Sequence, residues 1–251
     1  MQSNKLSKIL GLIPSRMGSS RFPGKPMAEI LGKPMIGHVY ERVKQNKQLN
    51  EVAVATCDYE IFDYIQNEGG KAIMTSNKHE RASDRCADAL LVIEKENNIK
   101  YDIVVMVQGD EPMIHPDMIS EAIQPMIDDS EILVTNLLGK IETDTEFKNR
   151  NCIKVVCDIE ENALYFSREP IPTTSKTRNV PMRKQVCVIP FRRDFLLEYT
   201  QMTSTPIEIA ESIDMMRILE HGFSVKMVPT DYDTHAVDTP EDLKKVECLL
   251  R

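Results

Sequence analysis

The chain has 251 residues, of which 41% are hydrophobic and 28% are charged, and this suits one large folded domain or a core domain with a smaller appendage. Its formal net charge of −8 argues against nucleic-acid binding, because that affinity comes largely from Lys and Arg side chains that displace counterions. The chain also contains no apolar run near the ~18 residues of a membrane span, so we expect no membrane association.

Apolar β-type runs alternate with helical patterns through the first half of the chain. The predicted strands are residues 8–14, 51–56, 71–75 and the apolar start of 101–112. The predicted helices are residues 34–45, 58–69 and 82–97, the last with Ser83 or Asp84 as its N-cap. This alternation predicts an α/β fold with a Rossmann-like, mostly parallel sheet flanked by helices.

The second half of the chain is less regular. Its predicted elements are a hairpin at 152–166, an exposed loop at 167–185, a strand at 185–191, a helix at 207–222, a strand at 223–230 and a helix at 238–250. We expect a single α/β domain over residues 1–251, with an embedded lobe at roughly 150–205 that serves the substrate or dimerisation.

The loop that follows the first predicted strand, "IPSRMGSSRFPGKP" (13–26), carries Arg16, Arg21 and Lys25 together with glycine and proline. It is not a Walker A motif, because five residues separate its two glycines and a proline follows Lys25. Ligands of open α/β sheets bind beyond the carboxyl ends of the strands, and glycine-rich cationic loops suit phosphate. We therefore expect this loop to bind a polyphosphate.

Carboxylates follow the fourth predicted strand in "VVMVQGDEP", which delivers Asp110 and Glu111 to the same edge of the sheet. Beside a polyphosphate, such carboxylates are natural ligands for Mg²⁺. Asp110 also suits a simple turn before proline, and Asp238 in "VDTPEDL" also suits a simple helix N-cap.

Several segments together resemble one family in their order along the chain. They are "IPSRMGSSRFPGKP", "VQGDEP", "IKVVCD…ALYFSREPIP", "TPIEIAESIDMMRILEHG" and "VDTPEDL". They are similar to the cytidylyltransferases that make CMP-activated sugar acids, and most of all to the 3-deoxy-manno-octulosonate (KDO) cytidylyltransferases. The resemblance implies transfer of the cytidylyl group of CTP to a sugar acid, with Mg²⁺ as cofactor, release of pyrophosphate and a homodimeric, cytoplasmic enzyme.

The resemblance also implies a role for particular residues. The catalytic residues would be Arg16, Lys25 and Asp110. Those that bind the nucleotide would be Pro14, Arg16, Arg21, Lys25, Ser83, Arg85 and Gln108. Asp110 and Asp238 would bind Mg²⁺, and the sugar acid would contact Arg168, Gln185, Glu211 and Asp214.

The acceptor side departs from the family pattern in "QVCVIPFR", which has Gln185, Cys187, Ile189 and Phe191 where the family has His, Gly, Tyr and Tyr. Met215 stands where a polar Gln is expected, although a core role suits it equally well. A site that lacks these polar groups predicts a changed acceptor, because such sites select for the hydroxyls they bind. We expect an amino or deoxy variant of KDO, another nonulosonic-type acid or a phosphonate rather than unmodified KDO.

Two other functions stay open at this point. One is a nucleotidyltransferase of similar fold that uses another nucleotide or a non-sugar acid, and the other is a non-catalytic nucleotide-binding regulator. The regulator is disfavoured because Arg16, Lys25, Asp110 and Asp238 are all present.

Overall fold

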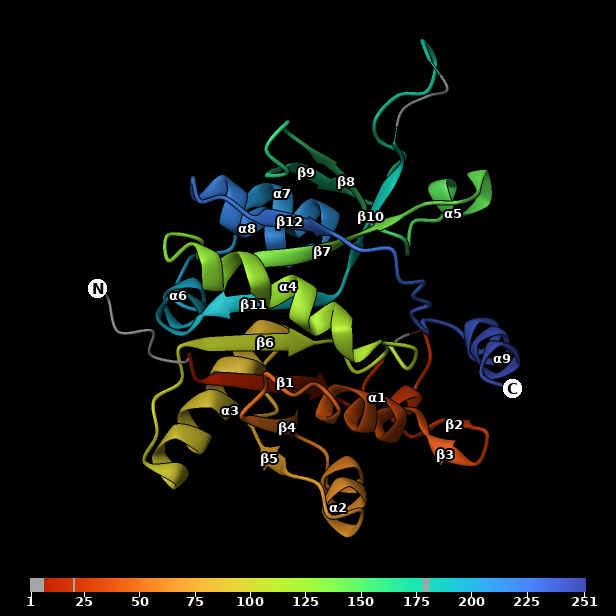
Figure 1. The fold of residues 1–251 in the computed structure, drawn as a ribbon. Coiled ribbons are helices and arrows are strands. Elements are labelled where there is room, and N and C mark those ends of the chain that lie inside the picture. Colours follow the sequence, from red (N-terminus) through yellow and green to blue (C-terminus); the bar gives the residue numbers. More distant parts are fainter. Residues whose placement is uncertain (1–6, 20, 178–180) are drawn as a thin grey trace.

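The computed structural model of the protein describes residues 7–19, 21–177 and 181–251, and residues 178–180 of the predicted 167–185 loop lie outside them. Two five-stranded sheets form the body of the molecule, with helices packed around both (Figure 1). A short two-stranded ribbon, β2 (Glu29–Ile30) and β3 (Lys33–Pro34), lies beside the first sheet.

The first sheet has the strand order β11-β6-β1-β4-β5. Its strands are β1 (Ile9–Ser15), β4 (Glu51–Thr56), β5 (Ala72–Met74), β6 (Ile103–Val107) and β11 (Val188–Arg192). Four of them run parallel, and β11 pairs antiparallel with β6. All residues of β1 and β6 are buried, as expected for central strands that helices cover on both faces. The predicted Rossmann-like, mostly parallel sheet is confirmed.

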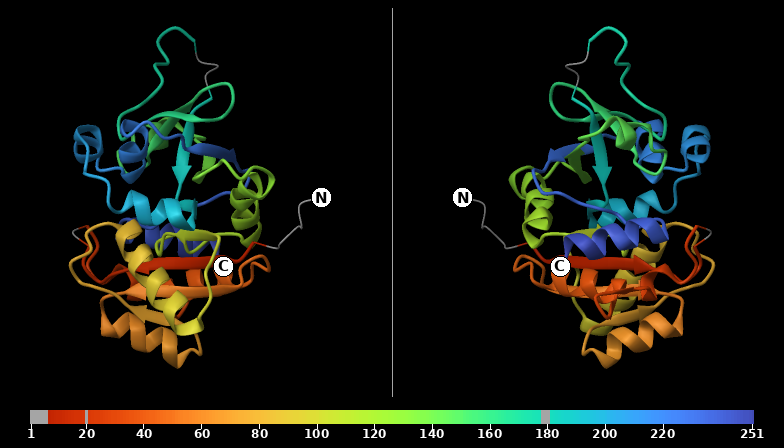
Figure 2. Two further views of the ribbon diagram at one scale, coloured as in Figure 1. Left: turned by 90° about the vertical axis from the view of Figure 1, so that its left-hand side faces the viewer. Right: turned by 90° about the vertical axis from the view of Figure 1, so that its right-hand side faces the viewer.

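Helices cover both faces of this sheet (Figure 2). One face packs against α3 (Ala82–Asn97) and α6 (Arg193–Tyr199). The opposite face packs against α1 (Met35–Lys44), α2 (Tyr59–Asn67) and α4 (Pro116–Asp128). The three helices predicted in the first half are therefore present, but α3 begins from Arg81 as its N-cap. The predicted caps, Ser83 and Asp84, are wrong because both lie inside the first turn.

The second sheet has the strand order β12-β7-β10-β8-β9. Its strands are β7 (Thr135–Lys140), β8 (Lys154–Cys157), β9 (Ala163–Ser167), β10 (Arg183–Val186) and β12 (Lys226–Pro229). The predicted hairpin is confirmed as the antiparallel pair β8–β9. The sheet takes strands from residues 135–229, while the embedded lobe at 150–205 stays a prediction.

The predicted single strand at 185–191 is wrong, because this run is divided between the two sheets. Val186 of β10 lies opposite Leu137 of the second sheet, and Val188 of β11 lies opposite Val107 of the first. Cys187 is the residue at which the chain crosses over. The apolar run is continuous because both halves are buried, although in different sheets.

The predicted helix at 207–222 is also divided, into α7 (Pro206–Glu211) and α8 (Asp214–Glu220). Ser212 interrupts it with φ of 53°, a left-handed conformation that a helix cannot contain. The predicted end at Gly222 is confirmed, with φ of 82°.

The remaining elements are the 3₁₀ helix η1 (Lys25–Met27), α5 (Asp144–Lys148) and α9 (Pro240–Leu249). The sequence predicts α9, which begins from Thr239 with Pro240 in its first turn. Val237 and Val246 pack against Ile30 of the β2–β3 ribbon, so the C-terminal helix lies close to the cationic loop (Figure 1). This packing brings Asp238 to the functional edge of the first sheet.

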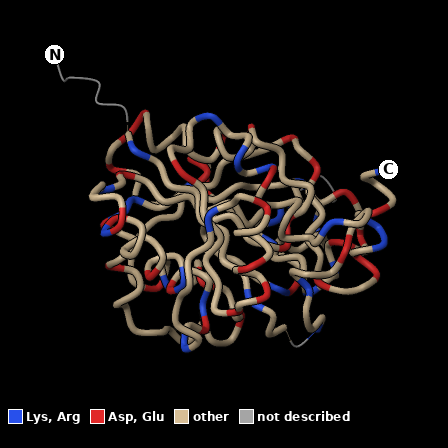
Figure 3. The backbone as a smooth tube through the Cα atoms, turned by 90° about the horizontal axis from the view of Figure 1, so that it is seen from below, with Lys and Arg blue, Asp and Glu red and all other residues tan. Residues whose placement is uncertain are grey.

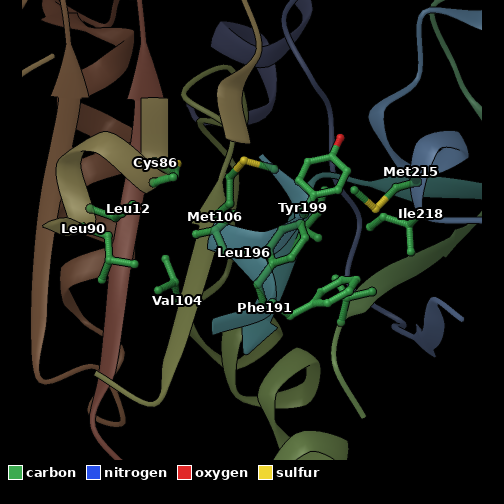
Figure 4. Close-up of a cluster of buried hydrophobic side chains, with 14 of the residues drawn as sticks. Leu12, Cys86, Leu90, Val104, Met106, Phe191, Leu196, Tyr199, Met215 and Ile218 are labelled. Carbon is green, nitrogen blue, oxygen red and sulfur yellow. The ribbon is translucent and has the colours of Figure 1, made fainter. Parts of the chain in front are cut away.

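One core cluster joins the two sheets (Figure 4). Phe191, Tyr199 and Met215 meet there, and Phe191 and Met215 are fully buried. Ile189 belongs to the same cluster and is 3% exposed. Three of the substitutions that suggested a changed acceptor are therefore core residues, and the core interpretation of Met215 is confirmed.

Acidic and basic residues are interspersed over the described chain (Figure 3). Among the described residues, none of the helices has both the length and the apolar character needed to cross a bilayer.

Candidate active site

The cationic loop follows β1, and residues 108–110 follow β6, which is the parallel neighbour of β1. Because parallel strands end at the same edge, these two segments meet there. Together with the segment that leads into α3, they line a cavity of about 310 Å³. Seven of the predicted nucleotide-site or catalytic residues line it, namely Pro14, Arg16, Arg21, Lys25, Arg85, Gln108 and Asp110.

Local hydrogen bonds hold the cationic loop in shape. The Asp58 carboxylate accepts a hydrogen bond from the Met17 amide (2.8 Å), and the Gly24 amide donates to the Met17 carbonyl (3.1 Å). Gly24 has φ of 74°, which glycine adopts without strain. Pro26 is buried in the 3₁₀ turn that follows. The cations are thus displayed on a shaped loop, although residue 20 lies outside the described part.

The predicted cations and carboxylates meet in the structure. Lys25 Nζ lies 2.8 Å from Asp110 Oδ2 and 3.5 Å from Asp238 Oδ1, and the Arg21 guanidinium lies 2.9 Å from Asp238 Oδ1. Burial acts to lower the pKa of Lys25, but the two carboxylates outweigh it and raise this pKa. The Val237 amide donates to the Asp110 carbonyl (2.9 Å) and so joins the two acidic segments.

Glu111 differs from its predicted position, because it is buried and is absent from the cavity lining. Burial, together with the neighbouring Asp110, raises the pKa of Glu111 to about 8. Its Oε2 atom has no hydrogen-bond partner among the described residues. Of the two carboxylates after β6, only Asp110 faces the cavity.

The other predicted nucleotide ligands differ in their surroundings. Arg16 is exposed at the cavity. Arg85 is buried, and its guanidinium donates to Thr75 Oγ1 (2.6 Å) and to backbone carbonyls, which supports the segment before α3. Ser83 is fully buried, lies outside the cavity lining and has its hydroxyl 3.4 Å from Asp214, so its contact with a nucleotide stays a prediction.

Asp110 and Asp238 are the residues that suit a magnesium ion. Both contact the same Lys25 ammonium, so their carboxylates lie close together beside the cavity. No cluster of three or more His, Cys, Asp or Glu suited to a metal occurs among the described residues. Since Mg²⁺ commonly takes one or two protein carboxylates and completes its shell with phosphates and water, the pair fits an ion that binds together with a nucleotide.

None of the four predicted acceptor residues is in the lining of this cavity. The Arg168 guanidinium donates to three backbone carbonyls, those of Glu211 (2.6 Å), Arg150 (3.0 Å) and Ser212 (3.1 Å). The Glu211 carboxylate accepts from Ser167 Oγ and the Arg168 amide, both at 2.9 Å. In this structure both side chains hold the turn between α7 and α8, and their contact with the sugar acid stays a prediction.

The remaining two predicted acceptor residues also have protein partners. The Gln185 amide donates to Asn136 Oδ1 (2.6 Å) within the second sheet. Asp214 Oδ1 lies 2.8 Å from the guanidinium of Arg81, a residue that lines the cavity and that the sequence did not single out. The only signal for Arg81 was its place directly before the predicted helix.

The cytidylyltransferase family model matches residues 10–228, which include both the cationic loop and the segment after β6. The chain belongs to the cytidylyltransferase family. Two 3-deoxy-manno-octulosonate cytidylyltransferases are similar to it over 250 residues. That of Geotalea uraniireducens is 43% identical, with 95% of this chain and 97% of the relative covered. That of Geobacter metallireducens is 42% identical, with 95% and 96% covered.

The fold of this cytidylyltransferase is similar to that of a solved structure, CMP:2-keto-3-deoxy-manno-octonic acid synthetase complexed with CTP. The TM-score is 0.86 at 40% identity, and the match covers 97% of this chain and 98% of the other. The resemblance stated from the sequence motifs is thereby confirmed at the level of the family and of the fold.

Proposed function

We propose that this cytidylyltransferase transfers the cytidylyl group of CTP to KDO or a closely similar 2-keto sugar acid and releases pyrophosphate. The observation that carries the proposal is the meeting of Lys25 and Asp110, which line the cavity, with Asp238, which contacts Lys25 from outside the cavity lining. The relatives that bear this activity in their names, and the similar structure with CTP, support the choice of nucleotide and acceptor. Homodimerisation and a cytoplasmic location remain expectations from the resemblance.

In the proposed reaction a hydroxyl of the sugar acid attacks the α-phosphorus of CTP and loses its proton. The bond from the α-phosphorus to the bridging oxygen breaks, and the electron pair leaves with pyrophosphate. Arg16, Arg21 and Lys25 would neutralise the phosphate oxygens, and this stabilises charge that grows on the leaving group. Asp110 and Asp238 would hold Mg²⁺, which when bound supplies further positive charge at the phosphates and favours ionisation of the attacking hydroxyl.

Lys25 would have to exchange partners when CTP binds. Its ammonium lies against Asp110 and Asp238, and its side chain is 12% exposed. A triphosphate brings negative charge and a metal brings positive charge, so Lys25 would move to phosphate as the carboxylates turn to the ion. Before CTP binds, these ion pairs keep the Lys25 ammonium and the carboxylates of Asp110 and Asp238 together at the site.

Unmodified KDO becomes the first acceptor to test. Ile189, Phe191 and Met215, whose apolar character argued against it, are buried in the core and do not face the cavity. Gln185 and Cys187 remain as departures from the family pattern, so the amino analogue of KDO stays in the comparison.

Pyrophosphate release in the presence of each of the four ribonucleoside triphosphates tests the proposal directly. With KDO as acceptor, we expect CTP to exceed ATP, GTP and UTP by about 100-fold or more in kcat/KM, as a polar base-recognition site allows. The acceptor panel contains KDO, its amino analogue and a phosphonate. Tight CTP binding without pyrophosphate release from CTP in the presence of any of these acids would instead favour the nucleotide-binding regulator.

Removal of divalent cations tests the proposed metal. We expect EDTA to lower pyrophosphate release to background and added Mg²⁺ to restore it, because the triphosphate charge is otherwise too poorly balanced for attack. Circular dichroism before and after EDTA is the control for folding. Full activity in EDTA would contradict a metal role for Asp110 and Asp238.

A further inference from the structure

The turn between α7 and α8, residues 211–214, is held by an arginine on each side. Arg168 donates to the backbone carbonyls of Glu211 and Ser212 from the side of the second sheet. Arg81 binds the carboxylate of Asp214, the first residue of α8, from the side of the first sheet. The backbone at Ser212 is left-handed, so local helix geometry does not shape this turn and its contacts must do so.

Arg81 belongs to two parts of the molecule at once. It is the N-cap residue of α3 and lines the nucleotide cavity with a side chain that is 26% exposed. Its Nη1 atom lies 2.8 Å from Asp214 Oδ1, and its Nη2 atom lies 3.4 Å from Glu208 Oε1 of α7. A guanidinium has five N–H donors in a rigid plane, so these contacts leave donors that can face the cavity.

The charges around Arg81 are matched in pairs. Glu208 is fully buried and already receives two hydrogen bonds from Arg217, at 2.7 and 2.8 Å. Among the described residues, Asp214 forms its ion pair with Arg81 through Oδ1, and the Ser83 hydroxyl lies 3.4 Å from its Oδ2. Both groups that hold the Asp214 carboxylate thus come from the start of α3.

We propose that Arg81 is a positioning residue that couples the nucleotide cavity to the 211–214 turn and so sets that turn for the acceptor. The proposal rests on the proposed function for its acceptor, but the contact network is independent of it. A nucleotide in the cavity contacts Arg81, restrains its guanidinium and thereby restrains Asp214 and the turn. In this way CTP binding prepares the side of the site that receives the sugar acid.

Hydrogen–deuterium exchange of peptides spanning residues 206–214 tests the coupling without turnover. In the wild-type protein we expect saturating CTP with Mg²⁺ to slow exchange in this segment by about threefold or more, as local opening becomes less frequent. In Arg81→Ala the slowing should be lost, while Arg81→Lys should keep part of it. Arg183→Ala is the matched control, because Arg183 pairs with Glu161 at 2.5 Å, is 32% exposed and lies outside the cavity lining.

Steady-state kinetics supply the second readout. We expect Arg81→Ala to raise the KM for the acceptor about tenfold and the KM for CTP by less than about threefold, the size of effect that loss of one charge-assisted hydrogen bond gives. Asp214→Asn should raise the two KM values in the same way. The double variant should have a KM for the acceptor no higher than that of the more affected single variant, because the two substitutions break the same interaction.

The outcomes separate the two proposals. The coupling is overturned if CTP slows hydrogen–deuterium exchange of residues 206–214 in Arg81→Ala as it does in the wild type. It is also overturned if CTP slows exchange in neither protein. Equal rises in both KM values overturn it as well, since they indicate a general loss of structure. If CTP slows hydrogen exchange in an Arg81-dependent way but the protein releases no pyrophosphate from CTP with any acid, the coupling is supported and the proposed function is rejected.

Discussion

Asp110→Asn is expected to lower kcat for pyrophosphate release by about 1000-fold while weakening CTP binding by less than about tenfold. The substitution keeps the size of the side chain but removes the charge that lies 2.8 Å from Lys25 and beside Asp238. An amide is a poor ligand for Mg²⁺, whereas the cationic loop that we assign to the triphosphate is unchanged. Single-turnover kinetics and calorimetric titration with CTP measure the two effects separately.

The control for this variant is Asp231→Asn, which removes an exposed carboxylate that pairs with Lys140 at 2.5 Å. It lies outside the cavity lining, so turnover should be unchanged. Wild-type turnover in Asp110→Asn would refute both the metal role of this carboxylate and the reaction scheme built on it.

Glu208→Ala is expected to lower the free energy of unfolding by about 3–5 kcal/mol, which is the usual effect of leaving one partner of a buried ion pair alone. Glu208 is fully buried, and the side chain of Arg217 is only 6% exposed, so water cannot replace the lost carboxylate. Glu208→Gln should lose less, because the amide oxygen still accepts from Arg217. Urea unfolding at pH 7 measures the difference for both variants.

The loss in Glu208→Ala should also depend on pH. Burial acts to raise the pKa of Glu208, but its hydrogen bonds from Arg217 and from the Thr205 amide outweigh this and lower the pKa from 4.5. The stabilisation is therefore present above the unfolded-state pKa and is lost as the pH falls through the lower folded-state pKa. We expect wild type and variant to converge in acid.

The exposed pair Arg251–Glu247, at 3.0 Å, gives the matched control. Glu247→Ala should change the free energy of unfolding by less than about 1 kcal/mol, since exposed ion pairs contribute little. An equally small loss for Glu208→Ala would show that the buried pair is not the structural support that we infer.

The first half of the fold was predictable because its signals are local. The runs 51–56 and 82–97 match β4 and α3 to the residue, since a buried parallel strand and an amphipathic helix each carry a distinct periodicity. The second half was harder for the same reason. The apolar run at 185–191 reports burial but not which sheet buries it, and the helical pattern at 207–222 does not reveal the left-handed Ser212.

The candidate site shows the same division. Its cationic loop and Asp110 could be placed together because the carboxyl ends of neighbouring parallel strands share an edge. Glu111 could not be placed, because the residue after Asp110 turns inward and is buried by its surroundings. Ile189 and Phe191 could not be told from pocket residues, because an apolar side chain has the same sequence pattern in a core and in a pocket wall.

By itself, the sequence determined the kinds of chemistry available to this protein: a shaped loop of cations, acidic residues at a strand end and an alternation of strands and helices. The tertiary structure decided which groups meet. It brought Asp238 to Lys25 across 213 residues and joined Arg81 to Asp214 across 133. Periodicity and turn chemistry act between near neighbours in the chain, whereas these contacts depend on how α9 and α8 pack on distant elements.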